Sequence, residues 1–105
     1  MSRYGQHGKL IAQPGQGDAL AAHLLEAARL LEPVDDCDLY VVGRSEDDPD
    51  AVWVTEVWRS KEAHAASLTM PEVRELIDRA RPLMAGGADR LETVPVGGKG
   101  LGTGG

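Results

Sequence analysis

Two histidines and a tryptophan are the residues of this chain whose types and positions best fit proton transfer beside an aromatic ligand. His7 and His64 carry imidazoles, which ordinarily change charge between about pH 5 and 8 and can accept a proton at neutral pH. Trp58 ends a run of strand-forming residues, where an indole offers a flat wall and an N–H donor. The sequence therefore predicts His64 and His7 as catalytic bases and Trp58 as a substrate-binding wall.

The three histidines differ in how well their surroundings fit a pocket. His7 lies between glycines on an expected strand, so it lines a cavity, bonds a backbone carbonyl or sits at a dimer seam. His64 shares a helix face with Leu68 and lies one turn before Ser67, which places Ser67 as a polar contact in the same pocket. His23 falls off the apolar stripe of its helix and is predicted to be solvated.

Two further polar residues are expected near Trp58. Tyr40, on a neighbouring strand, could stack on a ligand or donate a hydrogen bond to it, or be an ordinary half-buried sheet residue. Glu56 points to the same side as Trp58 by strand alternation. It is either a cavity carboxylate or, as we favour, one half of an ion pair with a strand neighbour.

No pattern in the chain indicates a metal or a bound cofactor. The acidic stretch 46–50 lacks the residue pattern of a calcium loop and reads as a solvated hairpin connection. Cys37 is the only cysteine, so neither an intrachain disulfide nor a multi-cysteine metal site can form. No dinucleotide-binding fingerprint or P-loop is present. We therefore expect neither a metal nor a cofactor.

Composition narrows the partners and the compartment. The 105 residues carry a formal net charge of −6 and no cluster of Lys and Arg, which argues against nucleic acid and anionic membranes. No apolar run approaches the roughly 20 residues of a membrane span, and the first residues are polar. The sequence predicts an acidic, cytoplasmic protein with one domain over residues 1–96.

The rest of the pattern predicts four strands and two helical regions. Alternating and β-branched runs place the strands at residues 4–12, 38–44, 51–59 and 91–96. Helical spacing predicts one helix over residues 19–32, capped by Asp18. A second helical region begins at the Ser60 cap, is interrupted at Met70–Pro71 and continues to a Gly86–Gly87 stop. Residues 97–105 form a Gly-rich tail.

This order, β-α-β-β-α-β, is that of an α+β, ferredoxin-like fold with a four-stranded antiparallel sheet. Two helices cover one face of such a sheet. Trp53 and Trp58 are five positions apart and so point to opposite faces. The face without helices would expose a large apolar patch on a monomer, so we expect a homodimer formed through the sheet faces.

Several short motifs resemble the antibiotic biosynthesis monooxygenase (ABM) family, which includes quinol monooxygenases. The resemblance covers about residues 4–96. Its marks are the Pro14–Gly15 turn, the Asp48–Pro49 loop, the Glu56-Val57-Trp58 strand end before Ala63, the Leu68-x-x-Pro71 spacing and the segment 82–86. It implies a dimeric α+β barrel with a cavity between the sheet and the helices. It also implies oxidation of a quinol or polycyclic phenol by O₂ without a cofactor.

The resemblance carries over to some site positions and not to others. Trp58 occupies the place of a strand-end tryptophan that lines the cavity in monooxygenase members. Val54 stands at a substrate-binding position where some members carry a polar residue, and Ser67 stands where a histidine is common. His64, one helical turn earlier, could partly replace that histidine. The residues of the haem-degrading branch are missing, since Gly8, Ser67 and Ile77 stand in their places.

Two alternatives to a monooxygenase follow from these departures. One is a non-enzymatic module that binds a small molecule or serves a stress response. The other is an enzyme of the same fold with different chemistry, such as an isomerase, a cyclase or a decarboxylase.

Overall fold

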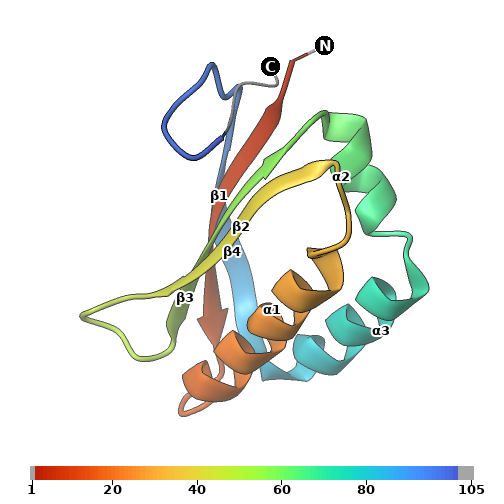
Figure 1. The fold of residues 1–105 in the computed structure, drawn as a ribbon. Helices are drawn as coiled ribbons and strands as arrows, with labels where there is room; N and C mark the ends of the chain where they lie inside the picture. The colour runs from red at the N-terminus through yellow and green to blue at the C-terminus, as the bar shows by residue number, and fades with distance from the viewer. Residues whose placement is uncertain (1, 102–105) are drawn as a thin grey trace.

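The computed structural model describes residues 2–101, apart from the side chains of residues 87 and 88. The strands and helices follow one another along the chain as Figure 1 shows. Their order is β1 (Tyr4–Ala12), α1 (Gly17–Leu31), β2 (Cys37–Arg44), β3 (Ala51–Trp58), α2 (Lys61–Ser67), α3 (Pro71–Ala80), the 3₁₀ turn η1 (Arg81–Leu83) and β4 (Met84–Thr93).

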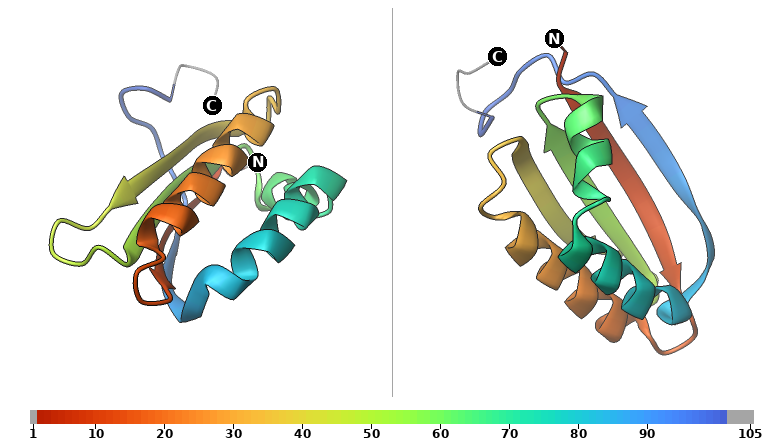
Figure 2. Two further views of the ribbon diagram at one scale, coloured as in Figure 1. Left: turned by 90° about the horizontal axis from the view of Figure 1, so that it is seen from below. Right: turned by 90° about the vertical axis from the view of Figure 1, so that its right-hand side faces the viewer.

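The four strands form one antiparallel sheet in the order β2-β3-β1-β4. The helices lie on one side of this sheet and leave the other side open (Figure 2). This is the ferredoxin-like α+β arrangement that the order of the predicted elements indicated. No helix in the described part of the chain is both long and apolar enough to cross a membrane.

The last strand differs from the prediction. β4 begins at Met84 instead of residue 91 and ends at Thr93, so Gly86 lies inside a strand rather than ending a helix. The helix ends early because Pro82 has no N–H to continue the ladder, and a 3₁₀ turn follows. Gly86, with φ +141°, lies where the β1–β4 register shifts, a backbone conformation that favours glycine.

The two predicted helix caps have different outcomes. Ser60 caps α2 as expected, since its side chain accepts a hydrogen bond from the Ala63 N–H at 3.0 Å. Asp18 does not cap α1, which begins one residue earlier, at Gly17. Its carboxylate instead accepts a hydrogen bond from Arg44 of β2 at 2.8 Å.

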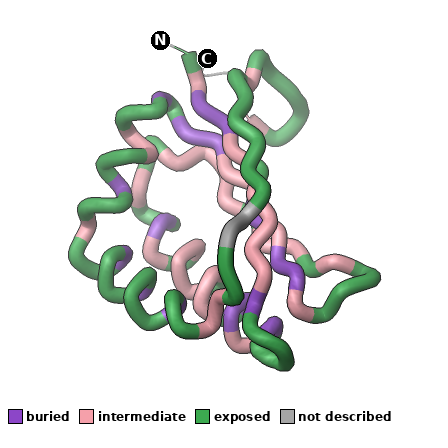
Figure 3. Tube along the Cα trace, turned by 180° about the vertical axis from the view of Figure 1, so that it is seen from behind, coloured by how far each residue is buried: buried purple, intermediate pink, exposed green. Residues whose placement is uncertain are grey.

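The core lies between the sheet and the helices. Buried residues follow the central strands and the sheet-facing sides of the helices, whereas the segment after β4 is exposed (Figure 3). Trp58 is 1% exposed and packs with Tyr4, Leu31 and Val73. Burying large side chains of this kind is the main source of stability in a domain of this size.

The start of α1 is packed tightly against the β2–β3 loop. The Gly17 N–H donates to Asp50 Oδ1 at 3.2 Å, and Arg44 donates to the Pro49 carbonyl at 2.6 Å. A Cβ atom on Gly17 would overlap that same Pro49 carbonyl oxygen. Only glycine therefore fits here, although alanine is the better helix former elsewhere.

We expect Gly17→Ala to lower the free energy of unfolding by about 1–3 kcal/mol, because loop and helix must separate to admit the methyl group. Chemical denaturation measures the change. Gly43→Ala is the matched control, since a Cβ atom on Gly43 meets no atom within 4 Å. Equal stability of the two variants would contradict the tight packing described above.

Candidate functional site

Two adjoining cavities lie between the sheet and the helices. The helix cavity, of about 250 Å³, is lined mainly by apolar residues of α1 and α3 together with His64 and Ser67 of α2. The sheet cavity, of about 530 Å³, is lined by residues of all four strands and by Leu24. Both cavities share five lining residues, namely Gln6, Leu24, Tyr40, Glu56 and Arg90.

Glu56 and His64 form a polar pair in the wall of the helix cavity. The Nε2 atom of His64 lies 3.7 Å from Oε1 of Glu56, and the two side chains are only 15% and 12% exposed. Strand alternation brings Glu56 and Trp58 to the helix side of β3, and the Trp58 indole N–H donates to the same carboxylate oxygen at 3.0 Å. A buried carboxylate requires such partners, and here it has two.

Aromatic rings hold His64 in place. Its ring centroid lies 5.6 Å from that of Trp58, in an edge-on arrangement, and 5.2 Å from that of Tyr4. α2 places His64 there because its first turn is fixed by the Ser60 cap. The imidazole therefore faces the cavity with its orientation set by neighbours on both sides. A carboxylate and an imidazole together can accept a proton from a bound hydroxyl group.

Tyr40 and Ser67 lie where the sequence placed them, on the cavity wall. The Ser67 hydroxyl donates to the His64 carbonyl at 2.6 Å, so it can only accept a hydrogen bond from a ligand. No described residue hydrogen-bonds to the Tyr40 hydroxyl. Burial, and next the nearby Glu56 carboxylate, raise the pKa of Tyr40, so the phenol stays a donor.

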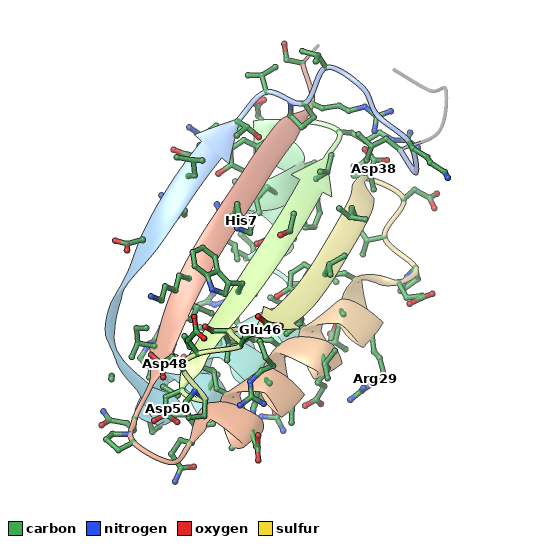
Figure 4. All side chains as sticks on the ribbon, turned by 90° about the vertical axis from the view of Figure 1, so that its left-hand side faces the viewer. His7, Arg29, Asp38, Glu46, Asp48 and Asp50 are labelled. Atoms are coloured by element: carbon green, nitrogen blue, oxygen red, sulfur yellow. The ribbon has the colours of Figure 1, made fainter. Side chains whose placement is uncertain are left out.

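Of the other predicted site residues, Val54 lines a cavity, whereas His7 and Trp58 line neither. His7 lies on the open face of the sheet, away from the cavities (Figure 4), where its ring stacks on Trp53 with centroids 4.8 Å apart. Its Nδ1 atom lies 2.7 Å from the Thr55 hydroxyl. Val54 is buried in the wall of the sheet cavity. Trp58 lines neither cavity and reaches the site through its N–H bond to Glu56.

Several cavity residues were missed in the sequence. Arg90 was missed because the predicted last strand began one residue after it. Gln6 alternates with Tyr4 on β1, a signal that could have placed it on the covered face. His23, predicted to be solvated, is half-buried and lines the helix cavity, with Nδ1 bonded to the Ala19 carbonyl at 2.9 Å. Glu56 is a cavity carboxylate whose partners are Trp58 and His64 rather than a residue of a neighbouring strand.

Among the described residues, no three histidine, cysteine or acidic side chains come together as metal ligands. The lining instead combines apolar side chains with the Glu56 carboxylate, the imidazoles of His23 and His64, the hydroxyl groups of Tyr40 and Ser67, the Gln6 amide and Arg90. This set can bind a flat apolar molecule, deprotonate it and stabilise a developing negative charge.

The model of the family described as antibiotic biosynthesis monooxygenase matches residues 3–79. The chain belongs to the ABM family. A solved structure from Chloroflexus aurantiacus J-10-fl, provisionally assigned to antibiotic biosynthesis monooxygenases, is 50% identical to this ABM protein. That alignment covers 96% of this chain and 100% of the other, with a TM-score of 0.87.

Two more distant structures with the same provisional assignment share the fold. One, from Caulobacter crescentus CB15, is 21% identical, has a TM-score of 0.82 and aligns over 91% of this chain and 92% of its own. The other, from Deinococcus radiodurans, is 24% identical, has a TM-score of 0.77 and aligns over 90% and 94%. No curated protein matches this ABM chain. Family and relatives together support monooxygenase chemistry in general.

We expect Gly8→Val to weaken binding of an aromatic probe, because Gly8 lines the sheet cavity of this ABM protein. A Cβ atom there meets only ordinary contacts with the backbone of Asp89 and the side chain of Arg90. The variant should therefore fold, while 2-naphthol binds roughly tenfold more weakly, judged by fluorescence titration. Gly8→Ala should fall between the two proteins, and an unchanged dissociation constant across the series would place the ligand elsewhere.

Proposed function

We propose that this ABM protein oxidises a quinol or polycyclic phenol with molecular oxygen and without a cofactor. The observation that carries the proposal is the Glu56–His64 pair in the wall of an apolar cavity, with Arg90 and the Tyr40 hydroxyl lining the same space. A chamber of this kind fits a flat hydroxyaromatic ring, and its base pair fits the first step of such an oxidation.

The reaction begins with loss of a proton from the substrate hydroxyl to the Glu56–His64 pair. The resulting anion is electron-rich enough to pass an electron to O₂. With an anthrone-like phenol, the ring CH₂ group becomes C=O, one oxygen atom of O₂ is retained and the other leaves as water. The substrate supplies all four electrons, so the reaction balances without an external reductant.

The other cavity residues stabilise negative charge as it develops. Arg90 and Tyr40 both carry donor groups, and both residues line the sheet and helix cavities. Donors fixed in an apolar site stabilise an oxyanion or a peroxide more strongly than water does. The apolar side chains of α1 and α3 that line the helix cavity reduce the contact of a bound intermediate with water.

Oxygen uptake by the purified protein tests this function, with anthrone-like phenols and hydroquinones as substrates and no added metal or flavin. We expect Glu56→Gln and His64→Ala each to lower kcat by roughly 10²–10⁴-fold, the usual contribution of a positioned general base. His7→Gln is the control, because His7 lies on the open face and should not affect turnover.

Labelled oxygen separates the outcomes. Incorporation of one ¹⁸O atom from ¹⁸O₂ into the product is expected of a monooxygenase. A product without the label indicates an isomerase, cyclase or decarboxylase. Uptake no faster than the spontaneous rate, together with tight ligand binding, would instead indicate a binding module.

We further propose that two copies pair through the open face of the sheet. Trp53 lies on this face, stacked on His7 and with the Lys9 ammonium 5.8 Å from its ring centroid. Val41 on β2 and Leu91 on β4 are 50% and 63% exposed, which is unusual for large apolar residues gathered on one sheet face. A second copy of the sheet would cover them.

Sedimentation velocity tests the pairing. We expect the native protein to sediment as a dimer and Trp53→Asp as a monomer, because a charge would then be buried in the interface. Leu25→Asp is the control, since Leu25 is 48% exposed on α1, on the opposite side of the molecule. A native protein that sediments as a monomer at high concentration would contradict the proposal.

A further inference from the structure

Three side chains on β1 and β4 form a chain of hydrogen bonds that leads into the cavities. The Tyr4 hydroxyl donates to Glu92 Oε2 at 2.6 Å. The Gln6 side-chain amide, through Nε2, donates to the Tyr4 oxygen at 2.8 Å. Gln6 and Glu92 face each other across the β1–β4 pair, so the three groups are held by the sheet itself.

The direction of each bond in this chain is fixed by chemistry. Glu92 stays ionised, because the hydrogen bond from Tyr4, followed by the nearby Lys61 ammonium, lowers its pKa. An ionised carboxylate can only accept, so the single Tyr4 proton must point toward Glu92. Burial and the bond to Glu92 raise the pKa of Tyr4, so that proton is retained. The Tyr4 oxygen then has only acceptor capacity left.

Gln6 must therefore turn its NH₂ group toward Tyr4 and its carbonyl oxygen away from it. No described residue donates a hydrogen bond to that oxygen, and the Gln6 side chain lines both cavities. The amide cannot reverse without placing two acceptors, the Tyr4 oxygen and its own carbonyl, against each other. The cavity thus contains an oriented neutral acceptor that the reaction proposed above does not use.

A second acceptor lies directly beside it. Gln6 and Glu56 are cross-strand partners in the β1–β3 register, and their side chains point to the same face. Cβ atoms of such partners are about 4.5–5.5 Å apart. Because the two side chains leave neighbouring positions on the same face, they can meet two hydroxyl groups of one ring better than hydroxyl groups at opposite ends of a long ring system.

We infer that Gln6 is a specificity-determining residue that accepts a hydrogen bond from a second hydroxyl group of the substrate, next to the hydroxyl that Glu56 and His64 deprotonate. This inference rests on the proposed function and refines its substrate class to aromatic diols with both hydroxyl groups on one ring. Tyr4 and Glu92 are positioning residues, since they act on the ligand only by holding the Gln6 amide in one orientation.

Binding under anaerobic conditions tests the inference without turnover. The probes are 1,3-dihydroxynaphthalene and 3-methoxy-1-naphthol, which differ in one donor. We expect the native protein to bind the diol roughly tenfold more tightly, the effect of one hydrogen bond to an otherwise unpaired acceptor. Gln6→Leu should abolish this preference. Equal affinity of the native protein for the two probes would overturn the inference.

Two variants of the positioning residues test whether the orientation of the Gln6 amide, and not only its presence, sets the preference for the diol. Tyr4→Phe keeps the buried ring but frees the amide to turn, so the diol preference should fall severalfold. Glu92→Gln keeps the shape but can donate to Tyr4, and it should reduce the preference in the same way. His7→Gln is the control, because His7 lies on the open face and its replacement leaves the Tyr4–Gln6 bond intact, so the preference should be kept.

Nuclear magnetic resonance tests the amide orientation without a ligand. A nuclear Overhauser effect between the Gln6 side-chain NH₂ protons and the Tyr4 ring protons is expected in the native protein and should weaken in Glu92→Gln. Its absence from the native spectrum would overturn the inference even if neither probe bound.

The binding assay also distinguishes this inference from the proposed function. Diol preference without oxygen uptake would retain the ligand class and reject the oxidation. Oxygen uptake together with equal affinity for both probes would retain the oxidation and reject the inference about Gln6. Failure of both naphthols to bind would reject the inference about Gln6 alone, because the oxidation is judged by oxygen uptake.

Discussion

The register between β1 and β3 is the constraint on which the rest of the structure depends. Tyr4 pairs with Trp58, Gln6 with Glu56 and Gly8 with Val54, so these side chains share the helix-covered face. A slip of one residue would move all of them to the open face and bring His7 and Trp53 inside. The register and the alternation of the strands therefore place these residues on one face of the sheet, independently of the helices.

Burial of Glu56 follows from that register and has to be compensated locally. Removing a carboxylate from water is unfavourable unless hydrogen bonds replace the lost solvent. Trp58 provides an indole N–H at 3.0 Å, and the imidazole of His64 lies 3.7 Å from the same oxygen. The Glu56 carboxylate and the His64 imidazole together can also share a proton taken from a ligand. Structural need and chemical capacity therefore coincide in one cluster, as they often do where polar groups are buried.

The sequence predicted most of the fold because local signals agreed with it. β1, β2 and β3 match their predicted ranges closely, and Ser60 caps α2 as expected. The start of β4 was wrong because Ala80 and Met84 continue the helical spacing of the apolar stripe, while Pro82 stops the helix between them. Arg90 was missed with that boundary. The sequence left both a cavity and a dimer seam open for His7, because alternation alone does not tell which face the helices cover.

The two departures from the family pattern are consistent with this arrangement of polar groups. Val54 pairs with Gly8, so the wall of the sheet cavity is apolar at that point. Neighbouring side chains, and not residue 54, therefore bring polar groups to this cavity. Gln6 lies two residues before Gly8 on β1, and Arg90 faces Gly8 across the β1–β4 pair. Gln6 brings a hydrogen-bond acceptor and Arg90 brings donors to the lining of the same cavity. On α2, Ser67 bonds back to the His64 carbonyl, and His64 is the residue that reaches Glu56. Polar side chains therefore lie one strand or one helical turn away from the positions that the resemblance indicated, which a search for residues at fixed positions would miss.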